Sequence, residues 1–333
     1  MLHQSTKSLL EKGKNLLAFS AGGDSTALFF LLLQNNISFD IAIVDYAIRK
    51  QSKEEVAYAQ ALAQKHQLLC HVYEAEPITH NFEANARSIR YNFFEKLIET
   101  YQYDNLLTAH HLGDRLEWML MQLCKGAGCV ELSGMQFIQK RENYTLIRPL
   151  LAEDKEVLLH FLDKYNIHYF EDATNEDERY TRNAFRHQFA QPLLKKYKKG
   201  IAKSFEYIDQ DKALLITPIK INKIKDFAYI EGNYSPRSIV YAIDNYFKSL
   251  GHIITAQERQ MLLSLKHNCI IGRKYSITKH PKGFLFIAPY IKNTQTMPKT
   301  FKEEMRKLRI DPKLRTYLFL EKSLVLFLSR LLA

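Results

Sequence analysis

Short apolar runs alternate with longer amphipathic stretches along the first half of the chain. The apolar runs have the length of buried strands, and the longer stretches repeat their apolar positions with the period of a helix. The pattern predicts strands at 15–19, 39–44, 68–73 and 105–108, and helices at 25–34, 54–66, 84–99 and 116–124. Such alternation predicts an α/β fold, with a parallel sheet, right-handed crossovers and both sheet faces buried.

The pattern changes near residue 200. Two more helices are expected at 153–165 and 185–194, and the lysine-rich stretch 195–199 with Gly200 is the predicted domain boundary. We expect a catalytic domain at 1–198 and a smaller, mainly helical region at 199–333, with a domain at about 200–290 and a tail at 291–333. In that region the pattern predicts helices at 238–250 and 257–265, and strand-like segments at 269–277 and 284–289.

Composition narrows the class of protein. With 46% hydrophobic and 25% charged residues among 333, the chain is globular rather than disordered or fibrous. Its longest apolar run, 27–33, is too short to span a bilayer, and the N-terminus shows no signal-peptide pattern. The four cysteines are too few and too scattered for a disulfide framework. We therefore expect a cytoplasmic protein that does not enter a membrane.

Charge is divided unevenly along the chain. Residues 191–333 hold 27 Lys and Arg against 11 Asp and Glu, a net charge of +16, whereas residues 1–190 carry −5. This asymmetry favours a catalytic body joined to a basic region that binds a polyanion. The alternative is a lysine-rich surface that only keeps the protein soluble.

The segment Ser20–Ser25 (SAGGDS) between the first predicted strand and helix is the most informative. A loop there lies at the carboxyl end of a parallel strand and at a helix N-terminus, where backbone N–H groups can bind phosphate. Asp24 would repel a bare phosphate and fits best as a ligand for phosphate-bound magnesium. The alternative is a glycine-rich turn in which Asp24 or Ser25 caps the helix. The loop has neither the Walker A nor the G-x-G-x-x-G pattern.

This loop resembles the S-G-G-x-D-S loop of the PP-loop ATP pyrophosphatases, which cleave ATP to AMP and pyrophosphate. Ala21 stands where that family usually has its first glycine. If the position needs a positive φ, alanine costs on the order of 1 kcal/mol there. The resemblance implies an adenine nucleotide alpha hydrolase-like, Rossmann-type domain, with ATP bound by Ser20, Ala21, Gly22, Gly23, Asp24 and Ser25.

Four further motifs, in order, resemble those of the tRNA(Ile)-lysidine synthetases. A-R-x-x-R-Y is matched in full at 86–91, and T-A-H-x-x-D-D-x-x-E-T is matched at 108–118 except at Gly113 and Trp118. R-P-L-L is present at 148–151, and D-x-[ST]-N at 172–175 is followed by R-N-x-x-R at 182–186. The family's H-x-x-H-G-L-R is degraded at 44–49 and keeps mainly Arg49.

The resemblance implies an ATP-dependent ligase that joins the ε-amine of lysine to C2 of the wobble cytidine in tRNA(Ile) with a CAU anticodon. ATP and Mg²⁺ are the expected cofactors, with Asp24 as the metal ligand; tRNA(Ile) and free L-lysine are the expected partners. The expected catalytic residues are Asp24, Arg90, His110, Asp114 and Glu117. Asp114 and Glu117 would bind lysine, and Arg182, Asn183 and Arg186 would bind tRNA.

The spacing of these residues agrees with such roles but leaves alternatives. His110, Asp114 and Glu117 share one helix face if the helix starts at His110; otherwise the two carboxylates belong to an ordinary solvated surface. Arg87 and Arg90, three apart on an apolar helix, suit anion contacts, or ion pairs with Glu83 or Glu95.

Arg182 and Arg186 suit RNA contacts, or ion pairs with Asp172 or Asp177.

At the level of function, the alternatives are a tRNA-thiolating PP-loop enzyme and a tRNA-binding protein with an inactive ATP site. The oligomeric state stays open, with a homodimer possible.

Overall fold

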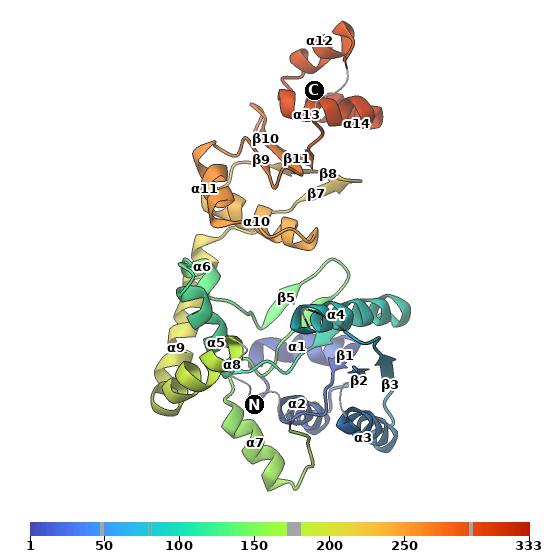
Figure 1. Cartoon of the computed structure of the whole chain (residues 1–333), viewed down its shortest axis with the longest axis vertical. Coiled ribbons are helices and arrows are strands. Elements are labelled where there is room, and N and C mark those ends of the chain that lie inside the picture. The colour runs from blue at the N-terminus through green and yellow to red at the C-terminus, as the bar shows by residue number, and fades with distance from the viewer. Residues whose placement is uncertain (47–49, 79, 81, 172–180, 293–295) are drawn as a thin grey trace. The chain divides into compact units, whose positions relative to one another are not determined.

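A computed structural model describes residues 1–46, 50–78, 80, 82–171, 181–292 and 296–333. The chain divides by its contacts into two units, Met1–Asp209 and Gln210–Ala333 (Figure 1). The predicted boundary at 198 lies eleven residues before this division, which falls inside a helix. In the described part of the chain, we find no helix that is both long enough and apolar enough to cross a membrane.

A six-stranded sheet forms the centre of the first unit. Its strand order is β3-β2-β1-β4-β6-β5, and every neighbouring pair is parallel except the β5–β6 hairpin. The predicted parallel sheet is therefore confirmed, while the two strands of the hairpin were not predicted. The strands are β1 (Asn15–Ala18), β2 (Phe39–Asp45), β3 (Cys70–Glu74), β4 (Asn105–Leu107), β5 (Ile138–Lys140) and β6 (Thr145–Ile147).

Helices cover both faces of this sheet, as predicted. Successive residues of β1 point to opposite faces: Leu17 packs in one core with α2, α3 and α7, and Leu16 packs in another with α4. The helical elements of this unit are α1 (Gln4–Lys12), α2 (Gly23–Gln34), α3 (Lys50–His66), α4 (Phe82–Tyr101), α5 (Leu112–Leu123), α6 (Cys129–Leu132), α7 (Lys155–Lys164), α8 (Thr181–Phe185), the π-helix η2 (Arg186–Ala190) and α9 (Gln191–Leu215).

Two helix starts differ from the prediction. Helix α2 begins at Gly23 rather than residue 25, and α5 begins at Leu112 rather than residue 116. The shared helix face of His110, Asp114 and Glu117 was expected only if α5 started at His110. It does not, because His111 is the N-cap of α5. Consequently His110 does not share a helix face with Asp114 and Glu117.

The second unit contains a five-stranded antiparallel sheet with helices on both faces. The strand order is β7-β8-β11-β10-β9. Helices α10 and α11 pack on one face, and α12, α13 and α14 pack on the other. The elements are β7 (Asn222–Ile224), β8 (Phe227–Glu231), α10 (Pro236–Ser249), α11 (Ala256–Ser264), β9 (Cys269–Ile271), β10 (Tyr275–Lys279), β11 (Phe284–Pro289), α12 (Lys299–Lys307), α13 (Pro312–Leu320) and α14 (Lys322–Leu331).

Candidate active site

The glycine-rich loop turns sharply between β1 and α2. Ala21 has φ 59°, in the left-handed region, and its side chain is completely buried. The condition stated for alanine at this position, a positive φ, is thus met. The chain therefore carries a strain on the order of 1 kcal/mol at a place where glycine would carry none.

The loop is held from outside by the segment that follows α7. The carbonyl of Ala21 accepts the N–H of Phe170 at 2.9 Å, and Gly22 forms an isolated parallel β-bridge with the same residue. Gly23 has no room for a side chain, because a Cβ there would lie 2.9 Å from Cδ2 of Leu159 and 3.4 Å from the ring of Tyr169. These contacts fix the loop's backbone.

The helix N-terminus behind the loop has the features of an anion site. Gly22 is the N-cap of α2 and makes no side-chain capping bond, so the alternative in which Asp24 or Ser25 caps this helix is wrong. The hydroxyl oxygens of Ser20 and Ser25 lie 3.1 Å apart, and Ser25 donates to the carbonyl of Gly22. The first-turn N–H groups of a helix lack helical acceptors and suit a phosphate.

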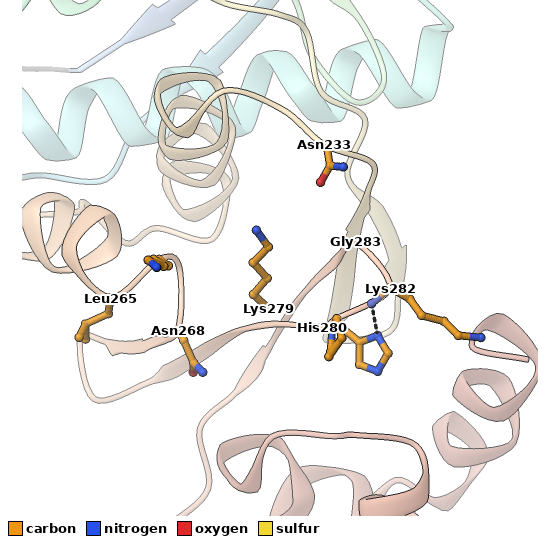
Figure 2. Close-up of a pocket in the computed structure, with 9 residues that line it drawn as sticks. Asn233, Leu265, Asn268, Lys279, His280, Lys282 and Gly283 are labelled. Carbon is orange, nitrogen blue, oxygen red and sulfur yellow. Dashed lines mark hydrogen bonds between the residues drawn. The ribbon is translucent and has the colours of Figure 1, made fainter.

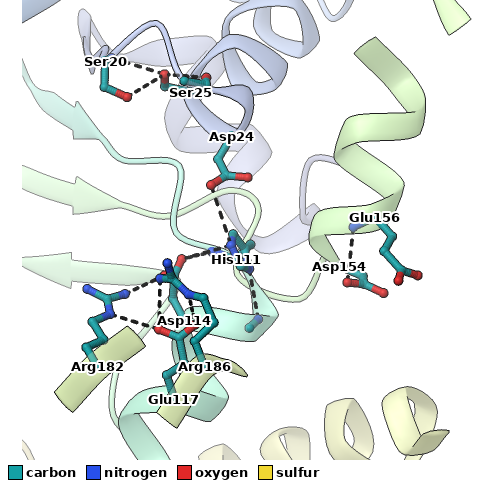
Figure 3. Close-up of polar contacts among 12 residues, drawn as sticks. Ser20, Asp24, Ser25, His111, Asp114, Glu117, Asp154, Glu156, Arg182 and Arg186 are labelled. Carbon is teal, nitrogen blue, oxygen red and sulfur yellow. Dashed lines mark hydrogen bonds and ion pairs between the residues drawn. The ribbon is translucent and has the colours of Figure 1, made fainter. Parts of the chain in front are cut away.

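Asp24 projects from the first turn of α2 toward α5 (Figure 3). Its Oδ2 lies 3.7 Å from Nε2 of His111, whereas its Oδ1 is buried and has no hydrogen-bond partner. A buried carboxylate oxygen without a partner is costly unless a cation or a donor reaches it. A hard cation such as Mg²⁺ suits this place beside a phosphate-binding loop, and Asp24 is the residue that could hold it.

His111 connects Asp24 to the start of α5. Its Nδ1 accepts the N–H of Gly113 at 3.0 Å, which leaves the Nε2 proton facing Asp24 and, at 3.6 Å, Oδ2 of Asp114. Asp114 in turn accepts the backbone N–H of His111 at 2.9 Å, completing a capping box. We did not predict His111 as a site residue. The signal that could have found it is the capping-box spacing, in which an N-cap residue is followed three positions later by an acidic residue, here Asp114.

Gly113 explains one departure from the family motif. A Cβ at this position would lie 2.7 Å from Cε1 and 3.0 Å from Nδ1 of the His111 ring. Only glycine lets that imidazole fold back on the first turn of α5. The His111 ring can adopt this position because residue 113 is glycine and not the aspartate of the family motif.

Asp114 and Glu117 form a buried ion-pair cluster with Arg182 and Arg186 (Figure 3). Arg182 donates to Oδ1 of Asp114 at 2.6 Å and to Oε2 of Glu117 at 3.0 Å. Arg186 donates to both oxygens of Glu117, at 2.6 and 3.2 Å. The Glu117 side chain is only 2% exposed, so the alternative of a solvated carboxylate pair is wrong.

Charged neighbours determine the protonation state of Asp114. Burial alone would raise the pKa of Asp114, but His111, His110, Arg182 and the N–H of His111 together hold it well below its ordinary value. Asp114 is therefore ionised at neutral pH. Asp114 and Glu117 are paired with Arg182 and Arg186, and Asp24 lies beside His111.

His110 lies before α5. Its Nδ1 is 2.9 Å from the hydroxyl of Thr108. Burial, together with the positive charges of Arg148, Arg182 and Arg87, outweighs the effect of Asp114 and lowers the pKa of His110 to about 4. The ring is neutral at physiological pH and adds no positive charge to the cluster.

The other predicted residues lie in mixed settings. Arg90 is exposed on α4. Burial of Tyr46 raises the pKa of that tyrosine to about 12, and the positive charge of Arg90 opposes this rise. Arg87 lies over the ring of Tyr91, 4.7 Å from its centroid. Among the residues that the structure describes, neither arginine pairs with Glu95, and Asn183 is buried on α8. Arg49, Asp172–Asn175 and Asp177 fall outside the described residues.

Comparisons with known proteins agree on one family. A family model described as a PP-loop domain matches residues 1–193. The tRNA(Ile)-lysidine synthase of Helicobacter pylori is 41% identical over 94% of this chain and 91% of its own length, and that of Campylobacter jejuni is 40% identical over 94% and 95%.

A solved structure supports the fold. The U34-tRNA thiolase NcsA from Methanococcus maripaludis, described with its [4Fe-4S] cluster, superposes with a TM-score of 0.51 over 63% of this chain and 75% of its own. At 16% identity, this likeness shows a shared fold alone.

Proposed function

This chain belongs to the tRNA(Ile)-lysidine synthase family of PP-loop proteins, and we propose that it ligates lysine to C2 of the wobble cytidine in tRNA(Ile) bearing a CAU anticodon. In the first half-reaction O2 of the cytidine attacks the α-phosphorus of ATP, an O–P bond forms and pyrophosphate leaves. In the second, the lysine ε-amine attacks C2, loses its proton, and displaces O2 as part of AMP. The proposed location is the cytoplasm, where these substrates are found.

The loop 20–25 serves the first half-reaction. Its backbone N–H groups and the hydroxyls of Ser20 and Ser25 bind the leaving phosphates. Asp24, with its buried unpartnered Oδ1, would hold Mg²⁺ on those phosphates, where the ion supplies charge neutralisation. Arg90, exposed on α4, is the proposed cation for the adenylate phosphate.

The carboxylates of Asp114 and Glu117 serve the second half-reaction. These two carboxylates are the proposed partners of the lysine ammonium group, which would replace arginine contacts that they make now. The neutral imidazole of His110 adds no competing positive charge. Helices α8, with Arg182 and Asn183, and η2, with Arg186, both contact α5. We assign these three residues to the tRNA as well, so that RNA binding would rearrange the pairs of the two arginines with the carboxylates.

The observation that carries the proposal is the position of His111 between the two half-sites. Its Nε2 lies within 3.7 Å of Asp24, on the ATP loop, and of Asp114, in the carboxylate cluster. A single imidazole therefore joins the group that would activate ATP to the group that would bind the amine. Two sites this close allow one cytidine to be adenylated and then attacked without moving.

The test is to incubate the full chain with ATP, Mg²⁺, radiolabelled lysine and a panel of tRNA transcripts. We expect label in tRNA(Ile) with a CAU anticodon, with AMP and pyrophosphate formed in equal amounts, and none in a tRNA(Met) transcript with the same anticodon. Asp24→Asn is the matched inactive control. Pyrophosphate release without lysine incorporation in any transcript would contradict the proposal.

A further inference from the structure

The second unit contains a pocket of about 740 Å³ between the turn after α11 and the β10–β11 hairpin (Figure 2). Its lining is polar and basic, and no carboxylate or Phe, Tyr or Trp side chain is among it. The lining residues are Asn233, Leu265, Lys266, Asn268, Lys279, His280, Pro281, Lys282 and Gly283.

Lys266 and Lys279 supply the pocket's available charge. Figure 2 shows the Lys279 side chain extending into the space that Asn233 faces from the other side. Within the described part of the chain, neither lysine is within ion-pair distance of a carboxylate. Since an ammonium group attracts anions most when no carboxylate neutralises it, the pocket has a positive potential.

Three other polar residues of the lining, His280, Lys282 and Asn268, are held by hydrogen bonds. His280 contacts the carbonyl of Leu308 through Nε2 and accepts the N–H of Lys282 through Nδ1. Lys282 points away and donates to the carbonyls of Leu332 and Ala333. The amide of Asn268 donates to Asp311.

The wall that carries Lys266 is strained. Lys266 and His267 are consecutive non-glycine residues with φ 48° and 67°, each costing on the order of 1 kcal/mol. His267 is 7% exposed and its Nε2 has no hydrogen-bond partner, while burial and the charge of Lys279 lower its pKa. A positive charge on His267 is therefore disfavoured, and the cations of the pocket are its lysines.

We propose that this pocket binds phosphate groups of the RNA backbone, with Lys279 and Lys266 as the contacts. The inference rests on the proposed function and gives a place in the second unit for its RNA substrate. Without an aromatic side chain on which a base could stack, the lining suits the backbone rather than a nucleotide's base. The net charge of residues 210–333, with 22 Lys and Arg against 9 Asp and Glu, favours a polyanion over a single free phosphate.

The test compares Lys279→Glu and Lys266→Glu with Lys299→Glu in the full chain. Lys299 is an exposed lysine in α12 outside the pocket, so its substitution makes the same change in net charge. Fluorescence anisotropy with labelled tRNA(Ile) gives the affinity at several salt concentrations. We expect each pocket variant to bind about tenfold more weakly, with the log–log salt slope reduced by about 0.7–0.9 for each phosphate that the variant no longer neutralises.

Three results would overturn the assignment. The first is that Lys299→Glu loses as much tRNA affinity as the pocket variants. The second is that neither Lys279→Glu nor the milder Lys279→Ala loses tRNA affinity, and the third is that inorganic phosphate or AMP displaces tRNA at low concentration. The first would indicate a diffuse basic surface, and the last a small-molecule site. Lysine incorporation should be unchanged in Lys299→Glu, which lies outside the pocket. If the wild type binds tRNA through the pocket but incorporates no lysine, the proposed function fails while the pocket assignment stands.

Discussion

Glu117 should be the residue whose charge contributes most to the stability of the first unit. Its buried carboxylate accepts three hydrogen bonds from two guanidinium groups, at 3.0, 2.6 and 3.2 Å. Glu117→Gln keeps the size of the side chain but removes its charge. The substitution leaves Arg182 and Arg186 with Asp114 as their partner on α5, at 2.6 and 3.8 Å.

The size of the effect follows from these hydrogen bonds. Hydrogen bonds to a charged group contribute about 1.5–3 kcal/mol each, and breaking a buried pair costs about 3–5 kcal/mol. The arginines are partly exposed, at 35% and 17%, and water will compensate part of the loss. We therefore expect the free energy of unfolding of the first unit to fall by about 2–4 kcal/mol. Arg186→Gln should cost less, and the double variant should cost about 1–2 kcal/mol less than the sum.

Urea unfolding followed by tryptophan fluorescence measures this directly. Trp118 is the chain's single tryptophan and lies next to Glu117 on α5, so its signal reports the first unit. Glu54→Gln, at an exposed position of α3, is the matched control and should change stability by less than about 0.5 kcal/mol. A loss below about 1 kcal/mol in Glu117→Gln, or strict additivity in the double variant, would refute the view that these pairs act as one buried cluster.

Three further predictions concern the chemistry and its pH dependence. Asp24→Ala should abolish ATP cleavage while the circular dichroism spectrum stays unchanged; pyrophosphate release at the wild-type rate would remove Asp24 from the magnesium site. Asp114→Asn should uncouple the half-reactions, so that adenylated tRNA accumulates on a gel; an unchanged dependence on lysine would contradict this. For His110, the pKa of about 4 lies below the ordinary 6.5, so the unfolded chain takes up a proton first as the pH falls. The urea midpoint should therefore drop between about pH 6.5 and 4, and less in His110→Gln; parallel curves for the two proteins would refute it.

The pattern of the sequence predicted those parts of the fold that depend on local rules. Four strands and the crossover helices could be located because buried parallel strands are apolar runs, and because turns and helices separate them. The loop 20–25 was found for the same reason, since its residues are contiguous. The comparison of alanine with glycine at position 21 raised the question of a positive φ, which only the structure answers.

Long-range pairings could not be predicted from the sequence in this way. Arg182 and Glu117 are 65 residues apart in sequence, and nothing local to either indicates that they meet. The start of α5 was missed because histidine is an unusual N-cap, although Leu112, four residues before Leu116 and buried with it, already begins the apolar period. The domain boundary expected at 195–200 stays a prediction: α9 runs on to Leu215 but is kinked at Tyr197 (φ −127°, ψ 19°), and the division by contacts falls after Asp209.

The left-handed alanine of the phosphate loop has a consequence for how this position can change over generations. Ala21→Gly would relieve about 1 kcal/mol of backbone strain, but it would remove a fully buried methyl group worth about 0.8 kcal/mol and loosen the unfolded chain by about 0.5–1 kcal/mol. The two losses together exceed the relief by less than about 1 kcal/mol, so the two residues should differ little in stability. A lineage can pass from one to the other without a compensating change elsewhere. A sequence motif that requires glycine at this position is narrower than the backbone conformation demands. Such a motif would miss chains that form the same loop with alanine.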